Sequence, residues 1–149
     1  MNVISLCYAS SEILFLKFVN LLFCRAPEPQ VLDYRTQQYK LLPAIASVFA
    51  MKFSAQWIWE MYNVVNSELD QGDLERLPEL HAASCCLKAL CTSDAASAVE
   101  TVRLACGGHG YMKSSNLPST YGLVTAACTY EGENTVLLLQ TARSVLKCW

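Results

Sequence analysis

An all-α fold, most simply an antiparallel helix bundle, is the class that the sequence predicts, and three observations support it. The chain has 149 residues, of which 53% are hydrophobic, enough for one domain with a packed core. Apolar residues recur at spacings of three and four over long stretches, which is the helical period. No stretch alternates between apolar and polar residues as half-buried strands do. We therefore expect helices that pack against one another.

The charge content is low for a chain of this size. Charged residues make up 16% of the sequence, and 11 Lys and Arg stand against 13 Asp and Glu. That balance provides no basic surface, which argues against a nucleic-acid partner. The small number of charges predicts that some apolar surface meets something outside the chain.

Residues 1–24 form the most apolar stretch, and we expect a packed helix here rather than a membrane span. Lys17 and Asn20 interrupt the apolar run, and a lysine near the centre of a span costs about 2.5–3.5 kcal/mol. A membrane anchor over residues 13–24 stays open as an alternative. Residues 25–30 contain two prolines and are predicted to be a connector.

Residues 31–69 are predicted to form a long helix with one buried apolar stripe. Pro43 is expected to kink this helix or to divide it in two, because proline lacks the amide that a helix interior needs. The stripe comprises Leu32, Leu41, Leu42, Ile45, Val48, Phe49, Phe53, Trp57, Met61 and Val64.

A helix boundary is predicted at residues 70–73, where Gly72 suits the left-handed residue that ends a helix. A second helix is expected over about residues 77–106, with a proline in its first turn and many alanines after it. Residues 107–111 end this helix, and residues 113–120 are predicted to be loop.

The last predicted helix follows residues 129–134, and apolar residues keep the helical period to its end. Asn134 or Thr135 is expected to cap its N-terminus with a side-chain oxygen. Arg143 and Lys147 suit its C-terminal half, where the helix dipole is negative.

Eight cysteines are present, but no CxxC pair and no nearby cluster of histidines accompanies them, so no metal site is expected. An even number allows disulfides. Cys85, Cys86 and Cys91, however, lie in an alanine-rich helical context that is typical of buried free thiols. We expect the reduced thiols of an intracellular protein.

Two segments could contact a phosphate-bearing ligand. Residues 33–40 place an arginine with Gln37 and Gln38 at a helix start, where they could bind phosphate or form a solvated first turn. Residues 106–111, CGGHGY, follow a helix, and their glycines would let backbone approach a ligand closely. A helix stop explains one of these glycines more easily than three. A Rossmann fingerprint would need a preceding strand, which is not predicted.

A third segment, YEGEN at residues 130–134, places carboxylates just before a helix. Glu131 could act as a general base if apolar walls surround it. A two-carboxylate glycosidase would need further sugar-binding features that the chain does not offer. The alternative is that Glu133 and Asn134 only stabilise the start of the helix.

Three motifs, in this order and spacing, resemble the C-terminal helical domain of the peroxisomal acyl-CoA oxidases, members of the acyl-CoA dehydrogenase superfamily. They are VLDYRTQQYKLLPAIA, ACGGHGYMKSSNLPSTYG and CTYEGENTVLLLQTARSVLK. The resemblance covers about residues 26–148. It predicts a non-matching apolar segment over residues 1–24, followed by part of an oxidase over residues 25–149.

The resemblance implies an FAD-dependent homodimer that oxidises fatty acyl-CoA to trans-2-enoyl-CoA and reduces O2 to H2O2 in peroxisomal β-oxidation. Glu131 matches the family's catalytic base, which removes the α-proton while the β-hydrogen leaves as hydride to the flavin. The positions that match FAD-contacting segments of the family are Gly107, Gly108, His109, Gly110, Asn134 and Thr135, with Gln37 and Gln38 as further candidates.

The sequence also departs from the family. It lacks the domains that supply most flavin and acyl-CoA contacts, and it does not end in a peroxisomal SKL-type signal. We therefore expect a portion of an oxidase that is inactive by itself. The alternative is a catalytically inactive helical module that acts only by association with full-length oxidase subunits.

Overall fold

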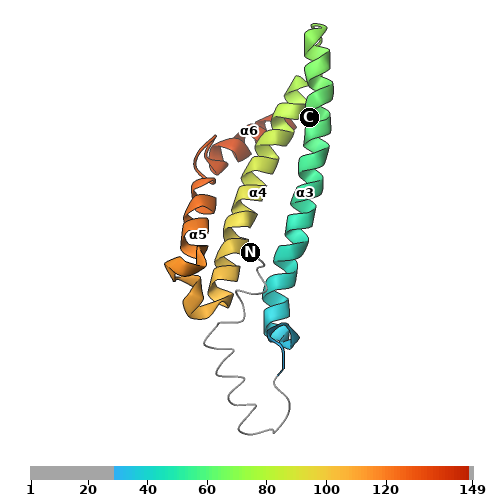
Figure 1. Ribbon diagram of the computed structural model, residues 1–149. Coiled ribbons are helices and arrows are strands. Elements are labelled where there is room, and N and C mark those ends of the chain that lie inside the picture. Colours follow the sequence, from blue (N-terminus) through green and yellow to red (C-terminus); the bar gives the residue numbers. More distant parts are fainter. Residues whose placement is uncertain (1–28, 148–149) are drawn as a thin grey trace. The chain divides into compact units, whose positions relative to one another are not determined.

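The computed structural model describes residues 29–147, and within them the chain forms four α-helices, three short 3-10 turns and no strand (Figure 1). The helices are α3 (Arg35–Asp70), α4 (Leu77–Ala105), α5 (Leu117–Ala126) and α6 (Asn134–Lys147). The 3-10 turns are η2 (Val31–Asp33), η3 (Gly107–Gly110) and η4 (Lys113–Ser115). The all-α prediction is confirmed. The predicted helix or anchor within residues 1–24 lies outside the described residues.

The helix α3 is continuous, so the prediction that Pro43 divides it in two is wrong. Proline removes the hydrogen bond to the carbonyl four residues earlier, which here belongs to Tyr39. Both Pro43 and Tyr39 are exposed, and water can therefore bind the carbonyl that the helix leaves free. The loss of one hydrogen bond at a solvated position does not outweigh the bonds on either side.

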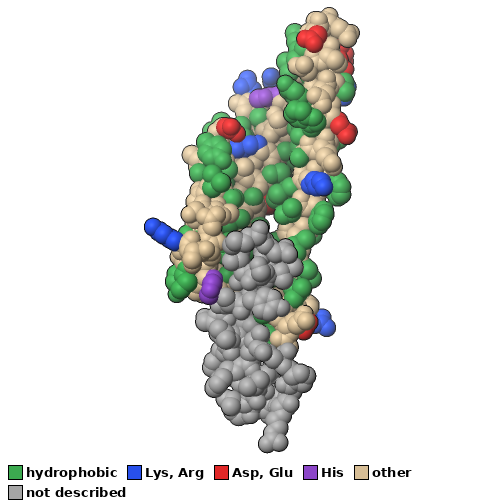
Figure 2. Space-filling view, in the orientation of Figure 1, with side chains coloured by type: hydrophobic (Ala, Val, Ile, Leu, Met, Phe, Trp, Pro, Cys, Tyr) green, Lys and Arg blue, Asp and Glu red, His purple; other side chains and the backbone are tan. Residues whose placement is uncertain are grey.

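The single buried stripe predicted for α3 is also wrong. Leu41 and Met61 are buried, with 4% and 8% of their surface exposed, but Phe53 is 64% exposed. Most of the other predicted stripe residues are exposed as well, and Figure 2 shows hydrophobic side chains along this helix. Helical period predicts which residues share a face, whereas burial also needs a second layer, and the described residues do not supply one here.

The helix α3 is long and apolar enough to cross a membrane by length and composition alone. Core helices of globular proteins meet the same criterion when other elements cover them. The exposed apolar surface of α3 therefore indicates a missing partner layer without identifying it.

The turn and helix after α3 agree with the sequence. Gly72 has φ +84°, the left-handed conformation that was predicted for it. The next helix, α4, begins at Leu77 and ends at Ala105, within one residue of the predicted end.

The prediction of loop over residues 113–120 is wrong, because α5 begins at Leu117. Pro118 falls in its first turn, where no amide is required. The Ser115 hydroxyl accepts a hydrogen bond from the Leu117 amide at 3.2 Å, and the Asn116 carbonyl accepts one from the Thr120 amide at 3.0 Å. Polar residues that look like a loop here start a helix.

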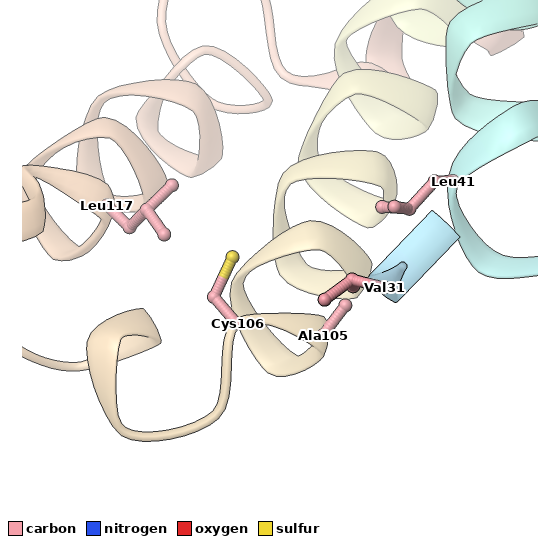
Figure 3. Close-up of a cluster of buried hydrophobic side chains, with 5 residues drawn as sticks. All are labelled: Val31, Leu41, Ala105, Cys106 and Leu117. Carbon is pink, nitrogen blue, oxygen red and sulfur yellow. The ribbon is translucent and has the colours of Figure 1, made fainter. Parts of the chain in front are cut away.

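The described residues fall into two compact units. The first comprises residues 29–46 and 96–124, and the second comprises residues 47–95 and 125–147. The first unit has a small core in which η2, α3, α4 and α5 each contribute buried side chains (Figure 3). Its members are Val31, Leu41, Ala105, Cys106 and Leu117.

The second unit contains the turn between α3 and α4 and the whole of α6. Its buried residues come in pairs four positions apart, Met61 with Val65 on α3 and Cys85 with Ala89 on α4. Residues four apart lie on one face of a helix, so each helix buries one edge and leaves the rest exposed.

No disulfide joins the five cysteines of the described residues to one another, and Cys85 and Cys106 are buried. Burial raises the pKa of the Cys91 thiol, and the neighbouring Asp94 and Cys86 raise it further. A raised pKa reduces the thiolate fraction, which is the reactive form. Cys91 therefore packs as a small apolar side chain.

Candidate functional site

The turn that carries Glu131 follows α5 and ends at the start of α6. The Tyr130 amide donates to the Ala126 carbonyl at 3.2 Å, and the Asn134 amide donates to the Cys128 carbonyl at 3.2 Å. Between these bonds Glu131 has φ +57° and Gly132 has φ +100°. A glutamate seldom adopts this left-handed conformation, which costs roughly 1–2 kcal/mol per residue. The surroundings of the turn must therefore hold it in place.

Gly132 is favoured by its backbone angle. A Cβ atom at this position would lie 2.8 Å from Cδ2 of Leu137, on the first turn of α6, and that side chain can rotate away. The positive φ is therefore the stronger reason for glycine here.

Asn134 fastens the turn to α4 through its side-chain amide. Its Nδ2 atom has two hydrogens, which it shares among three acceptors: the Ala89 carbonyl at 3.2 Å, the Thr92 hydroxyl at 3.0 Å and the Ser93 hydroxyl at 3.1 Å. Its Oδ1 atom accepts from Nζ of Lys88 at 3.0 Å. These bonds use the donors and an acceptor position of the amide, so the Asn134 side chain is committed to α4.

Lys88 also reaches the turn itself, because its Nζ atom donates to the Gly132 carbonyl. The Gly132 carbonyl lies just before α6, and the Lys88 ammonium group is its hydrogen-bond donor. The sequence analysis missed Lys88, Thr92 and Ser93. The sequence contains a signal that could have identified them. Lys88 is the only lysine in the alanine-rich helix α4, and Thr92, four residues later, lies on the same face of that helix.

Glu133, rather than Asn134 or Thr135, caps α6. Its Oε2 atom accepts from the Thr135 amide at 2.9 Å and from the Val136 amide at 3.3 Å, while the Thr135 hydroxyl donates to Oε1 at 3.1 Å. These bonds, first of all the one from the Thr135 amide, hold the pKa of Glu133 below its usual value, and Lys88 adds a smaller effect. The predicted side-chain cap from Asn134 is wrong because α4 engages its amide.

Glu131 itself is exposed. The described residues thus do not supply the apolar walls that the sequence analysis required for a base acting on a carbon acid. Any such walls would have to come from outside this part of the chain.

The glycine-rich loop lies in the first unit, and its glycines differ in what they contribute. Gly107 has φ +57° and closes α4 in the left-handed conformation. Gly110 is buried, and a Cβ atom on it would lie 2.0 Å from the Arg103 carbonyl oxygen. At Gly108 the nearest atom to a Cβ would be the Tyr111 hydroxyl at 3.5 Å, an ordinary contact. The left-handed backbone therefore explains Gly107 and packing explains Gly110, but neither explains Gly108.

His109, next to Gly108, is exposed. On α4, before the loop, Arg103 forms two 2.7 Å hydrogen bonds with Glu100 and lies over the Tyr121 ring at 5.5 Å. The contact with the Tyr121 ring joins the end of α4 to α5, and the loop between these helices carries Gly108 and His109.

Gln37 and Gln38 lie in the first unit near the start of α3, and their environments differ. Gln38 donates through Nε2 to the Leu32 carbonyl at 2.8 Å, so its amide stabilises the junction of η2 with α3. Gln37 is 5% exposed, and its Oε1 atom has no partner among the described residues. A buried acceptor without a donor is costly, which makes Gln37 the better candidate for a ligand contact.

Within the second unit, Glu131, Asn134 and Thr135 belong to one turn, as their spacing requires. The other predicted site residues, from the glycine-rich loop and from α3, belong to the first unit.

Comparison with known proteins decides the family. A family model described as the acyl-CoA oxidase C-alpha1 domain matches residues 19–146. The chain belongs to the acyl-CoA oxidase family. It is 61% identical over 123 residues to acyl-coenzyme A oxidase 1 of Drosophila melanogaster and 52% identical over 123 residues to peroxisomal acyl-coenzyme A oxidase 1 of Mus musculus.

Solved acyl-CoA oxidases also match the fold. The Caenorhabditis elegans acyl-CoA oxidase-1, solved in complex with FAD and ATP, aligns with a TM-score of 0.81 and 39% identity over 84% of this chain and 19% of its own. The tomato enzyme LeACX1 aligns with a TM-score of 0.77 and 47% identity over 80% of this chain and 18% of its own.

The chain is much shorter than these oxidases. The matched segment covers 83% of this chain but only 18% of the fly protein and 19% of the mouse protein. The predicted boundary after residue 24 stays a prediction.

Proposed function

We propose that this chain is part of an FAD-dependent acyl-CoA oxidase of peroxisomal fatty acid β-oxidation, acting as a homodimer. The overall reaction takes one fatty acyl-CoA and one O2 and yields one trans-2-enoyl-CoA and one H2O2. Family membership supports the reaction class, and one observation in this chain supports the site. Glu131 is a non-glycine residue in a left-handed conformation at φ +57°, and such conformations cluster at active sites.

In this proposal Glu131 is the catalytic base. Its carboxylate removes a proton from the α-carbon of the acyl thioester while the β-hydrogen leaves as hydride. A thioester α-proton is weakly acidic, so the base needs surroundings from which water is excluded. Glu131 is exposed among the described residues, and we propose that parts of the full-length enzyme, with the bound acyl chain, cover it.

The chain's own residues fit a contact with FAD. Gln37 offers a buried acceptor that has no partner in the part of the chain that the structure describes, and FAD carries N–H and O–H donors. Gly108 leaves its backbone open where packing does not require a glycine. We propose Gln37, Gly107, Gly108, His109 and Gly110 as FAD-contacting positions. FAD, when bound, accepts the hydride from the β-carbon and passes the two electrons to O2.

Asn134, Thr135 and Gln38 fit a different role. Their side chains are engaged by α4, by Glu133 and by the Leu32 carbonyl. We propose that they shape the backbone next to the site, with their backbone atoms available for a flavin contact.

The base assignment is tested in a chimera in which residues 25–147 replace the matching segment of the fly oxidase. Glu131→Gln should lower kcat by about 10²–10⁴-fold, the usual range for a general base, while flavin absorbance is unchanged. Glu133→Gln is the matched control, since it removes a carboxylate two residues away and should keep kcat within about threefold. Full activity of the Glu131→Gln chimera would sink the proposal.

A second candidate is an inactive module that associates with full-length oxidase subunits. The exposed apolar side chains of α3, among them Phe53 and Trp57, favour it because they need a covering partner. Mixing the 149-residue chain with FAD and palmitoyl-CoA should produce no H2O2. Co-purification of the tagged chain with the fly oxidase would support this candidate, and a chain that stays monomeric beside the enzyme would contradict it.

A further inference from the structure

We infer that Lys88 is a positioning residue for Glu131, holding the turn that carries the carboxylate at one place on α4. The inference rests on the proposed function, because it assigns Lys88 a role in the reaction that Glu131 performs. Lys88, Glu131 and Asn134 all belong to the second unit, so every contact in the argument lies within one compact body.

Lys88 binds the turn and is not a solvated surface charge. We call its bonds to the Gly132 carbonyl and to Asn134 the clamp. Its side chain is half-buried, and its Nζ atom donates to both the Gly132 carbonyl and Oδ1 of Asn134. The ion pairs found among the described residues join other side chains, Arg76 with Glu68 and Arg103 with Glu100. The ammonium group is therefore directed at the turn, 44 and 46 residues away in sequence.

The turn needs such a donor because of its backbone. Glu131 and Gly132 are both left-handed, and the peptide that joins Gly132 to Glu133 directs its carbonyl to Lys88. Two residues with positive φ form no regular hydrogen-bond ladder, so an outside donor must fix that carbonyl. A donor that fixes the Gly132 carbonyl fixes the peptide plane between Gly132 and Glu133, and so restricts the backbone of Gly132, the residue that follows Glu131.

Asn134 makes the clamp rigid. Its amide bonds to Ala89, Thr92 and Ser93 set the position of the turn along α4, and its Oδ1 orients the ammonium of Lys88. The Thr92 hydroxyl in turn donates to the Lys88 carbonyl at 2.8 Å, which leaves its lone pairs for Asn134. Lys88 and Asn134 thus form one network, and the network ends at the residue next to Glu131.

A base must lie within hydrogen-bond reach of the proton that it removes, and a misplacement of about 1 Å can cost about 10²-fold in rate. Loss of the clamp should therefore lower the rate of the chemical step while substrate binding, which depends on other contacts, is preserved. This pattern separates a positioning role from a merely structural one.

The test uses the chimera described above. Lys88→Met, which keeps the stem of the side chain and removes the donor, should lower kcat about 10–100-fold, with KM for palmitoyl-CoA and FAD content within about twofold. Lys88→Arg, which keeps a cationic donor, should recover kcat to within about threefold of the unsubstituted chimera. Lys52→Met is the matched control, because Lys52 is exposed on α3 and its substitution should leave kcat unchanged.

The outcomes separate the two proposals. Unchanged kcat in Lys88→Met, with Glu131→Gln inactive, overturns the positioning role and leaves the base assignment standing. An active Glu131→Gln variant overturns the proposed function itself. Equal losses of kcat and FAD content in Lys88→Met, without recovery by arginine, indicate a structural role only and overturn the inference.

Hydrogen exchange tests the clamp without an activity assay, by comparing the 149-residue chain with its Lys88→Met variant. The Asn134 amide, bonded to the Cys128 carbonyl, should exchange at least about tenfold faster in Lys88→Met. The Thr120 amide, bonded to the Asn116 carbonyl in the other unit, should exchange at an unchanged rate. Equal protection of Asn134 in both proteins would contradict the clamp.

Discussion

The two conspicuous turns of this chain, the glycine-rich loop at residues 106–111 and the glutamate turn at residues 129–134, reach unusual backbone conformations by different means. In the first, Gly110 packs directly on the carbonyl of Arg103, a residue of the helix just before it. In the second, side chains from α4 hold the Gly132 carbonyl and Asn134 from more than 40 residues away. Local steric contact shapes one turn, and long-range hydrogen bonds shape the other.

The two turns should therefore be sensitive to different substitutions. A turn that is shaped by close packing is destabilised when an atom is added to it, because the rigid backbone beside it cannot move aside. A turn that is held by long-range hydrogen bonds loses its fixed position when a donor is removed elsewhere in the molecule.

Gly110→Ala should be the most damaging change in the glycine-rich loop. Its Cβ atom would lie 2.0 Å from a backbone oxygen of α4, and we expect a loss of about 3 kcal/mol in unfolding free energy. Urea unfolding of the 149-residue chain, followed by circular dichroism, measures it. Gly108→Ala is the control, since its Cβ atom meets only an ordinary contact, and it should stay within about 0.5 kcal/mol. Equal losses in the two variants would contradict the steric account.

Gly132→Ala should cost less, about 2 kcal/mol. The residue would be forced to φ +100°, but the atom that it meets is the end of the Leu137 side chain, which can rotate away. The same unfolding measurement applies, and Gly122→Ala on exposed α5, with open space around its Cβ atom, is the control. A loss larger than that of Gly110→Ala would reverse the ranking of the two turns.

The cap on α6 should give a small, pH-dependent effect. The pKa of Glu133 is lower in the folded chain than its ordinary value of 4.5, chiefly through the Thr135 amide. A lowered folded pKa contributes stability that is present above the unfolded pKa and is lost as pH falls through the folded pKa. The Tm advantage of the native chain over Glu133→Gln should thus be full at neutral pH and shrink below about pH 4.5. An advantage that grows on acidification would contradict the cap.

Local features of the fold could be predicted from the sequence with good accuracy. The end of α4 and the left-handed residues at Gly72 and Gly107 depend on a few neighbouring residues, and glycine meets their backbone requirement directly. Family membership also followed from short motifs, and the comparisons confirmed it. The start of α5 at Leu117 was missed because the polar residues that help to begin a helix also occur in loops.

Features that depend on distant contacts could not be predicted in the same way. The side chain of Asn134 was expected to cap α6, but α4 engages it, and Glu133 takes that role. The apolar stripe of α3 was expected to be buried, although Phe53 and its neighbours are exposed. In both cases the residue type was interpreted correctly, while the partner lies elsewhere in the molecule or outside the described residues.

The low charge of the chain accompanies the exposed apolar surface of α3. The chain covers about a fifth of the length of the oxidases that it matches. An exposed apolar helix face is the kind of surface that a partner covers, which agrees with the proposed association with oxidase subunits.

By itself, the sequence determined the all-α class, most helix positions, the family and the candidate base Glu131. The helical period of apolar residues, the glycines at helix ends and the family motifs all depend on residues that are close in sequence, so the sequence is enough to identify them. Only the tertiary structure decided that Lys88 and Asn134 hold the Glu131 turn and that Gly110 is required by packing while Gly108 is not. It also decided that the buried Oε1 atom of Gln37 has no partner within residues 29–147. These depend on which atoms meet across the fold, because a hydrogen bond or a close contact has no signature until both partners are placed.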